Sequence, residues 1–184
     1  IIAAMPVLNG HWYWGCSGLG DDIARCSGFN VKACREAGIL SAGPVSAPYS
    51  PHKQKGNNRY YPGMGAQSLA DQWMGHIKDQ PDFVIFTTWN DLGEHHYVGP
   101  HYNVDTYPHG AYLELSAYFI RWYKTGKQPP IERDALFYFY PTQPVDLDCP
   151  KDPLGKPHLN QNAKYKVENC VYATVLLTAP ASVE

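Results

Sequence analysis

The chain has 184 residues, of which 44% are apolar, and its formal net charge at pH 7 is −2. This length suits one ordinary domain or part of a larger one, and the 15 basic residues are scattered, so neither nucleic acid nor an anionic membrane is indicated as a partner. No run of about 18 apolar residues occurs, so no membrane span is expected. Aromatic residues reach 14%, which suits either a sugar- or peptide-binding surface or an aromatic-rich core.

The first 38 residues predict short elements joined by turns. Residues 1–8 suit a short buried strand. Residues 9–16 combine turn formers with aromatic residues, which either line a substrate cleft or pack beneath a loop. Residues 31–37 predict a short helix that ends at Gly38, a residue favoured just past a helix end.

Five cysteines favour an oxidising compartment, and their odd number leaves one without a partner in the chain. Cys16, Cys26 and Cys34 lie in a Gly/Ser/Asp-rich region without the paired C-x-x-C spacing of a zinc site. A disulfide that closes a loop is therefore the favoured interpretation there. Cys149 and Cys170 flank a later connection, which a second disulfide would close. The chain does not begin with methionine and shows no leader, so a processed or cut chain is expected.

The middle of the chain starts with a strand of small residues over 39–46, followed by a loop over 47–65. A loop this long is usually functional or disordered. A helix is predicted over 66–78, because large apolar residues recur every four positions on one face. These residues are Leu69, Trp73 and Ile77.

An apolar run over 83–89 predicts a parallel strand that is buried on both faces. A loop over 90–108 and a helix over 109–124 follow it. The order helix, strand, helix, strand, helix predicts the α/β class, with a parallel sheet covered by helices over residues 1–128.

The character of the sequence changes after the double proline at 129–130. Strands are predicted over 135–140 and 171–178, and no helical period appears beyond residue 126. Residues 129–184 are therefore expected to form a separate β-rich element.

Two carboxylates, Asp91 and Glu94, follow the end of the strand predicted over 83–89, with Gly93 between them as a residue that permits a tight bend or a close approach to a ligand. In parallel α/β folds the loops after the strands build the active site. Two carboxylates in one loop can take different protonation states, as glycoside hydrolysis requires. The loop also offers rings that can stack on sugars and groups that can hydrogen bond. These are Trp89 and Tyr97, and Asn90, His95 and His96.

Other interpretations of this loop remain open. An Asp after a strand often only forms a turn or caps a helix. The acidic residues and histidines also resemble a metal-ligand set, but Glu94-His95-His96 lacks the H-E-x-x-H spacing that puts two histidines on one helical face. No metal and no other cofactor is therefore predicted, and the two histidines are expected to support the site or lie on the surface.

Residues 89–100, Trp-Asn-Asp-Leu-Gly-Glu-His-His-Tyr-Val-Gly-Pro, resemble the T-W-N-D-x-G-E-x-H-Y-[IV]-G-P signature of the fungal α-1,3-glucanases, the mutanases of glycoside hydrolase family 71. The likeness covers residues 38–184 and includes further segments that are similar to parts of that family. These are Gly43–Ser46 with the A-P-V-S segment, Tyr107–Gly126 with the next helix, and Asp134–Tyr140 and Ala173–Val183 with the trailing β-domain.

The resemblance implies the C-terminal portion of a (β/α)8 barrel followed by the beginning of a β-sandwich. It also implies extracellular or wall-associated hydrolysis of α-1,3-glucan with inversion, and it assigns the signature carboxylates to Asp91 and Glu94. The pair needed for inversion is either these two or one of them with a carboxylate elsewhere, since the family also uses an Asp from an early barrel strand that this chain lacks.

Departures from the family leave alternatives open. A full barrel needs about 250 residues, so the chain is expected to be a fragment or one piece of a nicked assembly whose partner is the rest of its own parent chain. Leu92 and His95 stand where the family often has an aromatic residue and a serine. The alternatives are a non-catalytic carbohydrate-binding or wall-structural protein on a decayed barrel, and a hydrolase of a related barrel family that acts on other glycans such as mannosides.

Overall fold

The structure is a computed structural model that describes residues 7–14, 18–49, 59–99, 110–141, 144–146, 158–159, 161 and 164–182. Its helices are α1 (Gly20–Ala37), α2 (Gln67–Asp79) and α3 (Gly110–Thr125). Its strands are β1 (Gly10–Trp12), β2 (Leu40–Ser46), β3 (Arg59–Tyr60), β4 (Phe83–Thr87), β5 (Ala135–Phe139), β6 (His158–Leu159) and β7 (Tyr172–Leu176). None of the described helices is long and apolar enough to cross a membrane.

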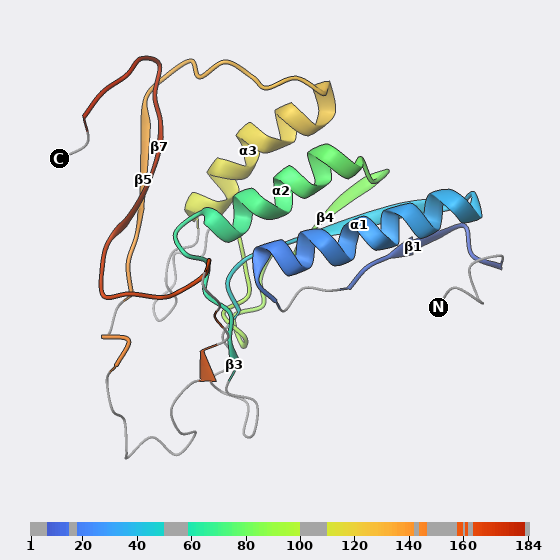
Figure 1. Cartoon of the computed structure of the whole chain (residues 1–184), viewed down its shortest axis with the longest axis horizontal. Helices are drawn as coiled ribbons and strands as arrows, with labels where there is room; N and C mark the ends of the chain where they lie inside the picture. The colour runs from blue at the N-terminus through green and yellow to red at the C-terminus, as the bar shows by residue number, and fades with distance from the viewer. Residues whose placement is uncertain are drawn as a thin grey trace.

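The central sheet has the order β1-β2-β4, and both strand pairs are parallel. Helix α1 connects β1 to β2, and α2 lies between β2 and β4 in the chain, so the predicted α/β alternation with a parallel sheet is confirmed. The three helices lie side by side in front of the sheet (Figure 1). The predicted helices over 66–78 and 109–124 and the strand over 39–46 are each found within about two residues of their expected bounds.

The sheet has one face toward the helices and one face turned away from them. His11 bonds to Asn30 of α1, a Cβ at Gly43 would collide with His76 of α2, and Val45 packs in the helix-facing core. Because side chains alternate along a strand, the neighbours of these residues face the other way. They are Trp12, Leu40, Ala42, Pro44, Ser46, Phe83, Ile85 and Thr87.

The helix-facing core is centred on Trp73, which is 1% exposed. Its ring stacks on Phe119 at 6.3 Å and meets Phe86 edge-on at 6.0 Å, and its Nε1 donates to Ser116 Oγ at 3.1 Å. Strand β4, α2 and α3 therefore all contact one another through the side chain of Trp73. Leu69 is also buried as expected, whereas Ile77 is only partly buried.

Three expectations from the sequence need correction. The helix over 31–37 is the last part of α1, which begins at Gly20 because Ile23, Ser27 and Asn30 turn the same buried face toward the sheet. The strand expected over 1–8 falls mostly on residues 1–6, which lie outside the described residues; residues 7 and 8 are not in a strand, and the first strand that the structure describes is β1. The strand over 83–89 is parallel but only partly buried, since β4 is an edge of the described sheet.

The expected disulfides are not formed, because Cys26, Cys34 and Cys170 are free thiols. Cys26 and Cys34 lie on α1 rather than in a loop, which removes the loop that a disulfide was expected to close. Cys16 and Cys149 lie outside the described residues.

The strands predicted over 135–140 and 171–178 are found as β5 and β7. They pair as an antiparallel ribbon beside the amino-terminal ends of α2 and α3 (Figure 1). Phe139 of the ribbon lies 5.2 Å from the ring of Tyr112 on α3. The buried Tyr165 hydroxyl donates to the Asp71 carboxylate and accepts from the Asp21 backbone N–H at 2.9 Å, which ties the segment before β7 to α1 and α2.

His76 is buried between α2 and β2, and burial lowers its pKa below the ordinary value of 6.5. Its Nε2 bonds to the carbonyl oxygen of Pro44 at 2.8 Å, so the neutral imidazole carries its proton on Nε2. Protonation of His76 is therefore easier in the unfolded chain than in the folded one.

We expect the free energy of unfolding to fall as the pH drops below about 6.5, by at most about 1.4 kcal/mol per pH unit from this one group. Above that pH neither state protonates His76, and its contribution is constant. Denaturant titrations from pH 8 to pH 5 on the wild type and on His76→Gln, which keeps a donor for Pro44, measure the effect. If the free energy of unfolding changed equally with pH in the two proteins, His76 would not be the group responsible.

Candidate active site

A tight loop over residues 88–99 follows β4 and folds back on itself. The Val98 N–H donates to the Thr88 carbonyl at 3.0 Å, and the His96 N–H donates to the Asp91 carbonyl at 3.0 Å. The Thr88 hydroxyl donates to the His96 carbonyl from inside the loop. Main-chain hydrogen bonds therefore fix the position of the residues between Asp91 and His96, which include Glu94.

Asp91 holds the turn together and also presents a carboxylate. Its N–H donates to Thr88 Oγ1 at 2.9 Å, and its Oδ1 accepts from the Glu94 N–H at 3.1 Å. Asp91 therefore does form a turn, as one interpretation of the sequence expected, and it uses one carboxylate oxygen, Oδ1, to do so. The tight bend does not require a glycine at position 93. A Cβ there would lie at an ordinary 3.5 Å from Asp91 Oδ1, and the residue of this turn with a positive φ, of 47°, is His95.

Glu94 is half-buried and points back toward the end of β2. Its Oε1 accepts a hydrogen bond from the Tyr49 hydroxyl at 3.1 Å. Tyr49 lies three residues after β2, and the carboxyl ends of neighbouring parallel strands meet at one edge of a sheet. Asp91 and Glu94 are therefore brought to the same edge of the sheet as the end of β2.

His96 lies beneath the loop rather than on the surface, with 2% of its side chain exposed. Its Nε2 lies 2.5 Å from Ser46 Oγ, and its ring meets that of Tyr49 edge-on at 5.4 Å. His96 thus supports the site from within. Among the described residues, no group of three or more His, Cys, Asp or Glu side chains is arranged to hold a metal ion.

The aromatic residues predicted to stack on sugars differ in exposure. Trp89 is 53% exposed, and Asn90 beside it is also exposed, so both are accessible to a ligand. Tyr97 is fully buried, so its ring offers no stacking surface in this structure. The sequence does not distinguish the two, because each is an aromatic residue flanked by polar neighbours.

Tyr49 is the residue at this site that the sequence does not single out. It falls in the 47–65 segment, which predicts only a loop, and no periodic pattern marks it. Its position could have identified it: a residue just past one parallel strand lies near the loop that follows the neighbouring strand, so a tyrosine there can contact that loop.

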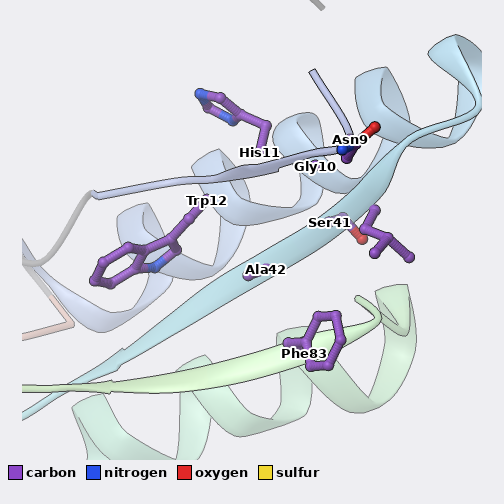
Figure 2. A pocket seen from close by; sticks show the side chains of 8 residues that line it. Asn9, Gly10, His11, Trp12, Ser41, Ala42 and Phe83 are labelled. Carbon is purple, nitrogen blue, oxygen red and sulfur yellow. The ribbon is translucent and has the colours of Figure 1, made fainter.

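A hollow of about 300 Å³ lies at the opposite edge of the sheet, where the strands begin. Figure 2 shows Trp12, Ala42 and Phe83 around it, with the helices behind the strands. It belongs to the face turned away from the helices and contains neither Asp91 nor Glu94.

Comparison with known sequences places the chain among glycosidases. Residues 38–184 match the model described as Glycosyl hydrolase family 71. A mutanase from Penicillium rubens is 30% identical over 122 residues, which cover 60% of this chain and 26% of that protein. A glucan endo-1,3-alpha-glucosidase from Schizosaccharomyces pombe is 32% identical over 130 residues, or 65% of this chain and 30% of that protein.

The ascus wall endo-1,3-alpha-glucanase of the same yeast is 24% identical over 209 aligned positions, which cover all of this chain and 46% of that protein. The chain thus spans between about a quarter and a half of the length of these relatives.

Among solved structures, the GH99 endo-alpha-mannosidase from Bacteroides thetaiotaomicron superposes with a TM-score of 0.55 at 12% identity, over 69% of this chain and 43% of that chain. At this identity the likeness concerns the fold alone.

Proposed function

The chain belongs to glycosyl hydrolase family 71, and from that premise we propose that the whole protein hydrolyses the α-1,3-glucosidic bonds of an α-glucan. The names of the three relatives support the substrate, since they describe a mutanase, a glucan endo-1,3-alpha-glucosidase and an ascus wall endo-1,3-alpha-glucanase. A wall polysaccharide as substrate implies an extracellular or cell-wall location.

We further propose that residues 1–128 are the C-terminal portion of a (β/α)8 barrel. Strand order follows chain order, β1-β2-β4, and parallel crossovers are almost always right-handed. When each crossover adds the next strand on the same side of the previous one, all the helices lie on one face of the sheet, as in a barrel. In a doubly wound sheet the strand order reverses direction, so helices cover both faces. Residues 129–184 would then begin a β-sandwich with the β5–β7 ribbon.

Features of the face turned away from the helices indicate that further strands cover it in the whole protein. Phe83 is 55% exposed on that face, although it lies in a strand. The Trp12 Nε1 and Thr87 Oγ1 atoms of the same face are buried and lack a hydrogen-bond partner within the described ranges. In a closed barrel, side chains of the other strands would cover Phe83 and offer partners to these two atoms.

Asp91 and Glu94 are the proposed catalytic carboxylates, with Trp89, Asn90 and His95 near the sugar. In an inverting glycosidase one carboxylic acid protonates the leaving oxygen, while a carboxylate about 6.5–9.5 Å away removes a proton from the attacking water. Asp91 and Glu94 form this pair, or one of them acts with a carboxylate from another strand of the whole barrel.

The observation that carries the proposal is the position of Glu94 in the loop that follows the carboxyl end of parallel strand β4. It is held there by the loop and by Tyr49, inside the segment that matches the family. Incubation of the whole protein with α-1,3-glucan, α-1,4-glucan, β-1,3-glucan and α-mannan tests it. Release of reducing ends from α-1,3-glucan alone is expected. Release from mannan alone would reassign the substrate, and binding to glucan without any release would indicate a non-catalytic protein.

A further inference from the structure

Tyr49 is held by its backbone before its side chain makes any contact. Its N–H donates to the Tyr61 carbonyl at 3.2 Å, and the Tyr61 N–H donates back to the Tyr49 carbonyl at 3.0 Å. The Tyr49 side chain is 7% exposed. A fixed backbone and a buried ring leave the hydroxyl little freedom to move.

The side chain of Tyr49 joins the ends of two strands. Its hydroxyl donates to Glu94 in the loop after β4, and its ring lies at 85° to the ring of His96. His96 is in turn bonded to Ser46, the last residue of β2. The Ser46 N–H donates to Gln72 Oε1 of α2 at 2.7 Å, which anchors this chain of contacts in the helical layer.

We propose that Tyr49 is a positioning residue that fixes the orientation of the Glu94 carboxylate. This inference rests on the proposed function of Glu94 as a catalytic carboxylate. A tyrosine hydroxyl has a single proton to donate, and the hydrogen bond to Oε1 holds the carboxylate in one orientation. Hydrogen bonds to a carboxylate are among the stronger ones in proteins.

Tyr49 acts through Glu94 rather than on the sugar, because its ring is covered by the loop and by His96. Its loss should therefore change kcat more than it changes KM for the polysaccharide. A purely structural tyrosine would lower thermal stability and leave the kcat of the folded protein unchanged.

The test uses Tyr49→Phe in the whole protein, since Phe keeps the ring against His96 and removes only the hydroxyl. Tyr61→Phe is the matched control, because the Tyr61 hydroxyl makes no hydrogen bond within the described part of the chain and its ring lies 6.1 Å from that of Tyr49. We expect Tyr49→Phe to lower kcat on α-1,3-glucan by about 10- to 100-fold, the usual effect of one hydrogen bond to a charged group. KM should change by less than about 3-fold.

Tyr61→Phe should leave kcat and KM unchanged. A kcat in Tyr49→Phe like that of Tyr61→Phe, or a loss confined to KM, would overturn the inference.

A second readout does not depend on activity. In protein labelled with ¹³C at glutamate carboxyl carbons, the resonance lost in Glu94→Gln identifies Glu94, and at fixed pH its chemical shift should change in Tyr49→Phe and not in Tyr61→Phe. An unchanged chemical shift in Tyr49→Phe would refute the role of Tyr49. A wild-type protein that cleaves no glucan would refute the proposed function instead, and the two failures are thereby distinguished.

Discussion

Replacing Glu94 with glutamine is expected to lower kcat/KM on α-1,3-glucan by about 10³-fold, with little change in stability. Glutamine keeps the size of the side chain and can still accept a hydrogen bond from Tyr49, but it cannot take up or release the proton that glycoside hydrolysis requires. Reducing-end release under initial-rate conditions measures the loss, and thermal unfolding shows that the fold is retained.

Asp91→Asn should cause a loss of similar size, and it separates the two roles of Asp91. The asparagine side-chain oxygen can still accept the Glu94 N–H, so the turn is preserved while the charge is removed. Glu114→Gln, on an exposed position of α3, is the matched carboxamide control and should keep full activity. Wild-type rates in both Glu94→Gln and Asp91→Asn would remove the loop from the catalytic mechanism.

Trp73→Ala is expected to lower the free energy of unfolding by about 3–5 kcal/mol, the range found when a large aromatic residue in a core is truncated. The change removes the ring that touches Phe86 and Phe119 and leaves the Ser116 hydroxyl without its donor. Equilibrium denaturation in urea gives the free energy of unfolding directly.

The control for this variant is one residue further along the same helix. Met74 is 42% exposed, so Met74→Ala should change the free energy of unfolding by less than about 0.5 kcal/mol. Similar losses in Trp73→Ala and Met74→Ala would mean that Trp73 is not the centre of the packing between the sheet, α2 and α3.

The α/β alternation was predictable because strong local patterns agree with the tertiary contacts. The repeat of Leu69 and Trp73 marks the buried face of α2, and Gly38 ends α1 in a left-handed conformation with φ of 69°. The first half of α1 was not predictable in this way, since Ser27 and Asn30 resemble turn formers. They are buried in the helix because Asn30 bonds to β1 and Ser27 packs against Gly43.

The sequence singles out the two carboxylates of the loop as candidates, but it does not predict the residues that contact them. Asp91 and Glu94 stand out as charged residues after an apolar run, whereas Tyr49 lies 45 positions from Glu94 and meets it only when β2 and β4 pair. The roles of Tyr97 and His96 were equally hidden. Both are polar or aromatic residues in a polar segment, and they become buried where the loop folds back onto Thr88 and Trp89.

The stereochemistry of the first product tests the account most directly. Proton NMR of the whole protein acting on soluble α-1,3-glucan oligosaccharides follows the anomeric signals before mutarotation equilibrates them. An acid that protonates the leaving oxygen and a base that activates water on the opposite face of the sugar should release the β anomer first, and Glu94→Gln should release neither anomer. Initial appearance of the α anomer, or the same release by Glu94→Gln, would contradict the mechanism assigned to this loop.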